Sequence, residues 1–237
     1  MTLFVAIEGA DGAGKATAAT NVREALARRG ISAVVISFPR YGQTSGGFAI
    51  GQFLAGQFPV TVTPKAAAVL YALDRLESVS FVSQAAQDHE VVIFDRYIAS
   101  NMVYQASKVP ASEALALMSW IYQLEINTFG VEKPNVSFYL NTSLEFARKL
   151  MALKGQRSYT DKQYDAHEAD EKLQLAVRQN YDLVTKSGLA GPWHVVEAAS
   201  GCVLRSPSDI ASEITDHVLE QLRLNKDENR RSTTSRA

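Results

Sequence analysis

Residues 9–15 have the glycine and lysine spacing of a phosphate-binding loop, G-x-x-x-x-G-K. Glycines allow backbone N–H groups to surround phosphate oxygens, and the N-terminus of a following helix adds positive potential. The lysine can then reach the terminal phosphates of a nucleotide. We expect these phosphates to be held by residues of the loop and of the helix start: Gly9, Ala10, Asp11, Gly12, Ala13, Gly14, Lys15, Ala16 and Thr17.

The residue after the loop lysine departs from the usual pattern. This position is normally Ser or Thr, because the hydroxyl ligates Mg²⁺. The chain has Ala16 there, and Thr17 lies about 100° away around the axis of a helix. Two interpretations stay open: carboxylates and phosphates hold the metal without a hydroxyl, or metal-dependent transfer is impaired.

Charged residues follow two further apolar runs. Asp95 and Arg96 come after residues 91–94, where an aspartate beside a phosphate loop can organise Mg²⁺ or its water shell and the arginine can face the phosphates. Arg40 comes after residues 33–38, and its guanidinium can clamp a second phosphate with paired donors. Charged turns in contact with solvent are the alternative for both.

Tyr71 and Arg75 are four residues apart in a segment with the pattern of a long helix, so they lie on the same face of it. An aromatic ring beside a guanidinium can stack on a nucleobase while the guanidinium bonds a carbonyl edge of that base. A buried tyrosine beside an exposed arginine is the alternative.

Short apolar runs alternate with longer helical patterns along the chain. Strands are predicted at 3–7, 33–38, 91–94, 136–140 and 194–196, and helices at 17–29, at 63–87, from a capping box at 142–145, and at 206–224. This alternation predicts an α/β fold: a P-loop NTPase-type parallel sheet of about five strands, flanked by helices on both faces, with a small lid.

The chain is predicted to form a single domain, residues 1–224, because no linker or internal repeat divides it. The polar segment 155–165 lies between two helices, as a mobile lid would. Residues 225–237 contain no apolar residue except the final alanine, and we expect them to form a disordered tail.

Composition excludes several function classes. The 237 residues include 24 Lys+Arg and 25 Asp+Glu, a net charge of −1, so no overall positive field attracts nucleic acid or an anionic membrane. No stretch approaches the ~20 apolar residues of a membrane span. The single cysteine, Cys202, can form neither an internal disulfide nor a cysteine-based metal cluster. We therefore expect a soluble, cytoplasmic protein whose partners are small nucleotides and neither nucleic acid nor membrane.

Five segments, in order along the chain, resemble the thymidylate kinase family and most closely its actinobacterial branch: IEGADGAGK, FPRYG, LYALDR, DRYIASNMVYQ and DAHEADEKLQ. The resemblance implies a P-loop kinase that transfers the γ-phosphoryl group of ATP to dTMP, giving dTDP and ADP. It also implies Mg²⁺ as cofactor and a homodimer as the assembly. An apolar stripe is then either core or a dimer face: Trp120, Ile121, Leu124 and Phe129.

The resemblance implies roles for individual residues. Tyr71 stacks on thymine, and Arg75 and Asn101 bond the base. Tyr104 favours a deoxyribose. The dTMP site implied in this way consists of Phe38, Arg40, Tyr41, Tyr71, Arg75, Arg96, Ser100, Asn101, Tyr104, Asp165 and Glu168, and the expected metal ligands are Asp11, Asp95 and Glu168.

Phosphoryl transfer needs positive charge around the moving group, which Gly12 and Ala13 of the loop do not supply. We expect Arg157, helped by Arg148, to close over the phosphates. The predicted catalytic set is Lys15, Asp11, Arg96, Arg157 and Arg148. Two alternatives remain: a kinase for another pyrimidine nucleotide, and a non-catalytic nucleotide-binding regulator derived from a kinase, which Ala16 would favour.

Overall fold

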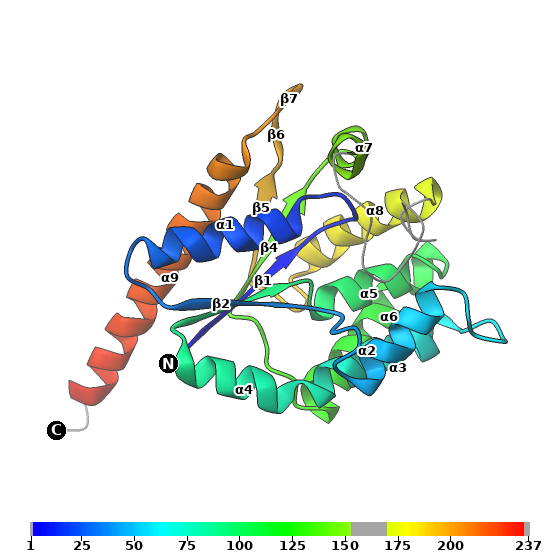
Figure 1. Cartoon of the computed structure of the whole chain (residues 1–237), viewed down its shortest axis with the longest axis horizontal. Coiled ribbons are helices and arrows are strands. Elements are labelled where there is room, and N and C mark those ends of the chain that lie inside the picture. Colours follow the sequence, from blue (N-terminus) through cyan, green and yellow to red (C-terminus); the bar gives the residue numbers. More distant parts are fainter. Residues whose placement is uncertain (1, 153–169, 235–237) are drawn as a thin grey trace.

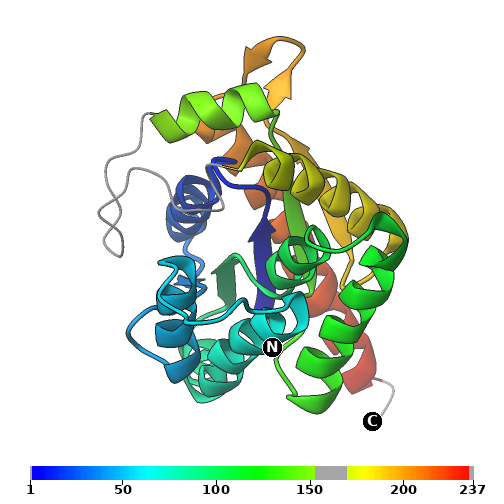
Figure 2. The same ribbon diagram turned by 90° about the vertical axis from the view of Figure 1, so that its right-hand side faces the viewer.

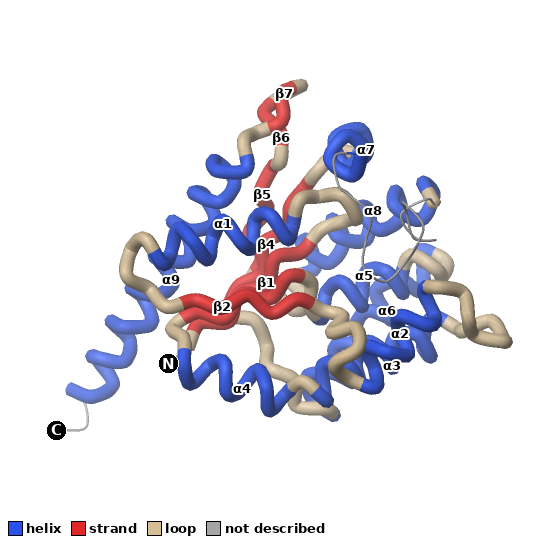
Figure 3. The backbone as a smooth tube through the Cα atoms, in the orientation of Figure 1, coloured by secondary structure: helices blue, strands red, loops and turns tan. Residues whose placement is uncertain are grey.

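A parallel five-stranded sheet forms the centre of the protein (Figure 3). A computed structural model of the chain describes residues 2–152 and 170–234, with side chains as far as residue 225, so the predicted lid at 155–165 lies outside the described residues. The strands run in the order β2-β3-β1-β4-β5, and every neighbouring pair is parallel. Their bounds are β1 (Leu3–Glu8), β2 (Ala33–Ser37), β3 (Val91–Asp95), β4 (Val136–Asn141) and β5 (Trp193–Glu197). The predicted α/β class is confirmed.

Helices connect the strands, and a short antiparallel pair of strands, β6 (Ala199–Ser200) and β7 (Val203–Leu204), follows β5 (Figure 1). The helices in the described residues are α1 (Lys15–Ala27), α2 (Ser45–Leu54), α3 (Pro64–Glu77), α4 (Val79–Asp88), α5 (Ile98–Ala106), α6 (Ala111–Tyr122), the π-helix η1 (Gln123–Thr128), α7 (Leu144–Ala152), α8 (Glu171–Ser187) and α9 (Pro207–Thr234). Within this part of the chain, none of them combines the length and the apolar character that crossing a bilayer would need.

The strands bury alternate residues in two apolar cores, one on each face of the sheet. Leu3, Val5 and Ile7 of β1 belong to the core under α1 and α9. Ala6 of β1 and Phe94 of β3 belong to the other core, which α4, α5 and α8 help to cover. Successive side chains of a strand point in opposite directions, so a strand that is buried on both faces is a continuous apolar run. Figures 1 and 2 show the sheet between these two helical layers.

The long helix predicted at 63–87 is two helices, α3 and α4, which meet at Ser78. The N–H of Ser78 donates to the carbonyl of Arg75, three residues earlier, at 3.1 Å. Its hydroxyl donates to the carbonyl of Asp74 at 2.7 Å. These local bonds tighten the last turn of α3 and end it, and helical periodicity in the sequence does not reveal them.

Two helix starts can be compared with their predictions. Thr63 caps α3 as predicted. At α7 the capping side chain is Ser143, whose hydroxyl accepts from the N–H of Phe146 at 3.2 Å. Thr142, the predicted cap, instead donates to the carbonyl of Ala13 at 3.4 Å and so ties the end of β4 to the glycine-rich loop.

The last helix, α9, continues to Thr234, whereas the sequence predicted its end near Leu224. The prediction of a disordered tail was therefore wrong for residues 225–234. This segment contains no Gly or Pro, and its charged residues are compatible with a helix, so nothing ends the helix where the apolar periodicity ends. Residues 235–237 lie outside the described residues.

Helix α2 lies very close to α3 because Gly46 has no side chain. A β-carbon at Gly46 would come within 2.4 Å of the backbone nitrogen of Asp74 and 3.0 Å of the carbonyl oxygen of Leu70. Neither backbone atom can move without α3 moving. We expect Gly46→Ala to lower the free energy of unfolding by about 1–3 kcal/mol, measured by urea denaturation.

Gly51 in the same helix provides the matched control. A β-carbon there would lie 3.6 Å from the ring of Tyr41, an ordinary contact. Gly51→Ala is expected to be neutral or to stabilise by about 0.5–1 kcal/mol, because alanine is the better helix former. Equal stability of the two variants would contradict the close approach of α2 and α3.

Candidate active site

The glycine-rich loop and Arg96 meet at the carboxyl ends of two adjacent strands. Residues 9–14 follow β1, and Arg96 follows β3. Because Ile7 pairs with Asp95, the residues after these strands emerge side by side. The N–H of Arg96 donates to the carbonyl of Ile7 at 3.1 Å. This is the edge of an open α/β sheet at which ligands bind.

The loop is confined by its neighbours as well as by its own sequence. Gly12 has φ +76°, and a β-carbon there would lie 2.6 Å from the carbonyl oxygen of Ala147 and 2.8 Å from the side chain of Met151. Helix α7 therefore lies directly against the loop. Gly14, with φ +88°, leads into the first turn of α1.

Lys15 lies buried beneath the loop. Its ammonium group donates to the carbonyl oxygens of Gly9 at 2.9 Å and Ala10 at 2.7 Å. Burial lowers the pKa of Lys15 to about 7, and the positive charge of Arg96 acts in the same direction. The lysine is thus positioned on the loop by two carbonyls that a phosphate can replace.

Asp11 connects the loop to Arg96 and to α8. Its carboxylate forms an ion pair with Arg96 and accepts from Nε2 of Gln174 at 2.8 Å. The side-chain oxygen of Gln174 accepts from the N–H of Asp11 at 3.2 Å. Burial raises the pKa of Asp11, but Arg96 and Lys15 together outweigh burial and hold that pKa below its usual range. The sequence did not single out Gln174, because only the fold brings α8 to the loop.

Arg96 has an unusual backbone conformation, with φ +64°. Few residues other than glycine adopt this region, and such strain is typical of functional sites. Its guanidinium also lies 5.6 Å from the centre of the Tyr104 ring. The strained turn aims Arg96 across the sheet edge towards Asp11.

A cavity lies between the loop, α3 and α5, and its space including the open mouth is about 550 Å³. Most of the predicted dTMP site is found together in its wall. The lining residues are Asp11, Phe38, Pro39, Tyr41, Leu54, Tyr71, Arg75, Arg96, Tyr97, Ser100, Asn101, Tyr104 and Gln105.

Two buried polar atoms on the α5 side of this cavity have no hydrogen-bond partner among the described residues. They are Oδ1 of Asn101, an acceptor, and Nε2 of Gln105, a donor. Buried polar atoms are normally paired, so atoms left without a partner beside a cavity indicate where a polar ligand binds. Gln105 was not predicted from the sequence, although it lies one helical turn after Asn101.

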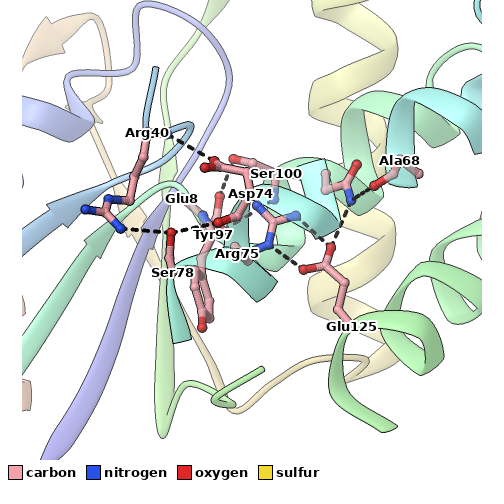
Figure 4. Close-up of polar contacts among 10 residues, drawn as sticks. Glu8, Arg40, Ala68, Asp74, Arg75, Ser78, Tyr97, Ser100 and Glu125 are labelled. Atoms are coloured by element: carbon pink, nitrogen blue, oxygen red, sulfur yellow. Dashed lines mark hydrogen bonds and ion pairs between the residues drawn. The ribbon is translucent and has the colours of Figure 1, made fainter. Parts of the chain in front are cut away.

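Arg40, which the sequence predicts as a phosphate clamp of the dTMP site, does not line this cavity. Its guanidinium donates to the hydroxyl of Ser78 at 3.0 Å and lies 4.0 Å from the centre of the Phe81 ring. Figure 4 shows Arg40 on the Ser78 side and Arg75 directed towards Glu125. The ring of Phe81 on α4 and the hydroxyl of Ser78, between α3 and α4, attract the guanidinium. Neither contact is visible from the position of Arg40 in the sequence.

Glu8, at the end of β1, is a buried residue that sequence reasoning missed. Its carboxylate accepts from the N–H of Tyr97 at 2.9 Å, from the hydroxyl of Ser100 at 2.6 Å and from the hydroxyl of Tyr181 at 3.0 Å. Burial raises the pKa of Glu8 despite these hydrogen bonds. The bonds hold the start of α5, and with it Arg96 and the cavity wall.

A second cavity, of about 610 Å³ including its mouth, lies on the other side of the loop. The start of α1, the end of β4, and the segment from β5 to α9 surround it. Its lining residues are Ala13, Gly14, Thr17, Ala18, Leu140, Leu150, Ala198, Leu204, Arg205, Pro207 and Ile210. The loop thus separates a cavity rich in polar groups from a more apolar one.

The remaining predicted residues lie outside both cavities or outside the described part of the chain. Ala16 is exposed at the start of α1. Arg148 on α7 is exposed and forms an ion pair with Glu171 at the start of α8. Asp165, Glu168 and Arg157 lie outside the described residues. In residues 2–152 and 170–234, no group of three or more His, Cys, Asp or Glu side chains is arranged to hold a metal.

Comparison with known proteins relates the chain to one family. A family model described as thymidylate kinase matches residues 7–202 of the chain. Thymidylate kinase from Mycobacterium tuberculosis (strain ATCC 25618 / H37Rv) is 32% identical over 197 residues, which span 83% of this chain and 92% of the relative. Thymidylate kinase from Bifidobacterium longum (strain NCC 2705) is 38% identical over 124 residues, which span 50% of this chain and 59% of the relative.

A solved structure has the same fold. The structure of thymidylate kinase from Candida albicans superimposes with a TM-score of 0.65, covering 95% of this chain and 92% of the other, at 21% sequence identity. At this level of identity the likeness concerns the arrangement of the sheet and helices.

Proposed function

This chain belongs to the thymidylate kinase family, and from that membership we propose how its two cavities divide the reaction between them. The family's activity is the transfer of the γ-phosphoryl group of ATP to dTMP, which yields dTDP and ADP. The observation that carries the proposal is the position of the loop, with one cavity on each side. The acceptor dTMP occupies the cavity beside Arg96, and the nucleoside of ATP occupies the cavity beside Thr17.

The polar groups of the first cavity support a thymine base as its occupant. Thymine presents a carbonyl acceptor at C4 next to a donor at N3. The wall of the cavity presents the guanidinium of Arg75 and, without a partner among the described residues, the acceptor Oδ1 of Asn101. Tyr71 lines the same cavity from α3 and provides a ring on which the base can stack.

The cations of the site neutralise the phosphates. Arg96, already held by Asp11, lies where the acceptor phosphate must approach the loop. Lys15 exchanges its two carbonyl partners for phosphate oxygens of ATP. Further positive charge comes from α7 and the segment after it, where we expect Arg148 and Arg157 to act. Because a nucleotide phosphate is already an anionic nucleophile, no general base has to create one.

The residues around the loop fit a Mg²⁺ ion held mainly by oxygen ligands. Asp95 ends β3 beside the loop, and its carboxylate is close enough to interact electrostatically with Lys15 and Arg96. Asp11 lies on the loop, and Glu168 is the third expected ligand. Carboxylates and phosphate oxygens are the ligands that Mg²⁺ prefers, so the missing hydroxyl at Ala16 leaves the other ligands in place. When bound, the ion neutralises charge on the β- and γ-phosphates.

We further propose that the protein acts in the cytoplasm and as a homodimer. One supporting observation is the partly exposed ring of Trp120, which is 37% exposed beside a groove of α3 and α6. Ile121, from the same apolar stripe, is fully buried. The stripe therefore contributes Ile121 to the core and exposes part of the Trp120 ring at the surface.

The test is an ADP-release assay with ATP, Mg²⁺ and a panel of nucleoside monophosphates. We expect turnover of dTMP to exceed that of dCMP and AMP by at least about a hundredfold, because a base with the opposite donor and acceptor pattern leaves polar groups of the site unpaired. Faster turnover of dCMP would indicate a kinase for another pyrimidine nucleotide. Absence of turnover with any acceptor, while ATP still binds, would indicate a nucleotide-binding regulator.

A further inference from the structure

Glu125 is a fully buried carboxylate that lies behind the base-binding wall of the first cavity. It belongs to η1, a π-helix that follows α6 directly, and none of its side chain is exposed. It contacts two residues that line the cavity, Arg75 of α3 and Asn101 of α5. We propose that Glu125 is a positioning residue that determines which pyrimidine the site accepts. The proposal rests on the acceptor site assigned above.

Glu125 holds the guanidinium of Arg75 in one orientation. Nε and Nη2 of Arg75 each donate to one oxygen of the Glu125 carboxylate, the second at a distance of 2.6 Å. A paired contact of this kind fixes the plane of the guanidinium. The remaining nitrogen, Nη1, has no hydrogen bond to another described residue, and Arg75 lines the cavity. The group that Arg75 can offer a base is therefore a donor at a fixed position.

Glu125 also fixes the orientation of the Asn101 amide. Nδ2 of Asn101 donates to Oε1 of Glu125 at 2.8 Å and to the carbonyl oxygen of Ala68 at 3.0 Å. Both partners are acceptors, so the amino side of the amide must face them. The carbonyl side, Oδ1, is left buried without a partner among the described residues. Asn101 thus offers an acceptor to a base and cannot turn over without placing its oxygen against two other oxygens.

These two constraints together define a pattern. Because the Glu125 carboxylate accepts from both Arg75 and Asn101, the groups that remain available to a base are one donor of Arg75 and one acceptor of Asn101. A pyrimidine with a C4 carbonyl and an N3–H matches both. Cytosine has an amino group at C4 and an acceptor at N3, so it is mismatched at both positions. Discrimination through buried hydrogen-bonding groups is strong, because a mismatched base leaves them unpaired.

Glu125 lies within a π-helical turn that follows α6. The bonds of a π-helix span five residues, and the N–H of Phe129 donates to the carbonyl of Leu124 at 2.9 Å. This widened turn interrupts the helical period after Tyr122. Short π-helical segments are frequent at functional sites.

Glu125→Gln is the variant that tests the proposal, because glutamine keeps the size of the side chain and replaces one acceptor by a donor. The new NH₂ group faces either an N–H of Arg75 or the NH₂ group of Asn101, so two donors meet. If it faces Asn101, the Asn101 amide can turn over to present its oxygen, but it then loses its hydrogen bond to the carbonyl of Ala68. The cavity then offers an NH₂ where Oδ1 had been. We expect kcat/KM for dTMP relative to dCMP to fall by about 10- to 100-fold, with KM for ATP unchanged.

The matched control is Glu113→Gln, an exposed carboxylate on the adjoining helix α6 that lies outside the base-binding cavity. It should retain the wild-type ratio of dTMP to dCMP turnover. Thermal denaturation confirms that each variant is folded. A folded Glu125→Gln protein with the wild-type ratio would overturn the inference, whereas a wild-type protein that turns over no monophosphate would instead overturn the assigned function.

Glu125→Asp provides a second test, which also serves if Glu125→Gln does not fold. Aspartate keeps two acceptor oxygens but withdraws them by one methylene group. The Asn101 amide then keeps its orientation while both cavity groups are held less firmly. We expect a higher KM for dTMP, an unchanged KM for ATP and a preserved preference for dTMP over dCMP. A KM for dTMP equal to that of wild type, or loss of the preference, would contradict the role assigned to Glu125.

Discussion

Replacing Lys15 by methionine is expected to lower kcat for dTMP phosphorylation by about a thousandfold, a typical cost of removing one group that stabilises charge in the transition state. Methionine fills a similar volume beneath the loop but carries no charge. The ammonium group of Lys15 is the only cation that the described structure places inside the loop itself, bonded to Gly9 and Ala10. The ADP-release assay at saturating ATP measures the effect.

The same variant should become more stable at neutral pH. Because the pKa of Lys15 is lowered to about 7 from an ordinary value of 10.5, the folded protein binds fewer protons than the unfolded chain between these two values. The free energy of unfolding therefore rises with pH across this window, and Lys15→Met should remove that contribution. Urea denaturation between pH 7 and 10 measures the slope.

Lys149→Met is the matched control, because Lys149 is an exposed lysine that forms an i,i+4 pair with Glu145 on α7. It should affect neither kcat nor the pH dependence of stability appreciably. Normal turnover by Lys15→Met would refute the role of the loop lysine. An unchanged pH slope would show that the lysine is charged as readily in the folded protein as in the unfolded chain.

Arg96→Ala is expected to lower kcat by about a thousandfold as well, because it removes a guanidinium from the place where we propose that the acceptor phosphate meets the loop. It also leaves the carboxylate of Asp11 with the neutral partners Gln174 and Tyr104 and with Lys15 as the nearby positive charge. Arg96→Lys is expected to recover only part of the loss. A lysine keeps the charge but cannot offer paired donors in one plane.

Arg40→Ala separates what the structure indicates from what the sequence predicted. The guanidinium of Arg40 lies over Phe81, outside the cavity that Arg96 lines. We therefore expect Arg40→Ala to lower kcat by less than about tenfold, well short of the effect of Arg96→Ala. Equal losses in the two variants, measured in the same assay, would mean that Arg40 turns into the cavity when the nucleotides bind.

Much of the fold could be predicted because its signals are local. The strands are short apolar runs, and the loop glycines and Lys15 lie within one short segment, residues 9–15. Where helix boundaries depended on particular side-chain bonds, prediction failed. Ser78 divides the long helix through its bond to Asp74. The end of α9 was misplaced for a different reason: its polar segment contains no Gly or Pro, so the helix continues beyond its last apolar residues.

The candidate site likewise combines residues that could be predicted with partners that only the structure reveals. Residue types and spacing alone indicated the phosphate loop, and the resemblance to a family indicated residues such as Tyr71, Arg75 and Asn101, which the structure brings to one cavity. The partners that orient these residues come from distant segments. Gln174 reaches Asp11 from α8, and Glu125 reaches Arg75 from a π-helix fifty positions along the chain.

By itself, the sequence determined which groups are present and which elements carry them, since backbone preferences and apolar periodicity act over a few residues. Only the tertiary structure decided which polar atoms find partners and which remain for a ligand. Nothing in the sequence distinguishes Arg40, turned towards Phe81, from Arg75, held by Glu125. Side-chain direction depends on charges and rings that chain folding brings close from far along the sequence, and these contacts have no local signature.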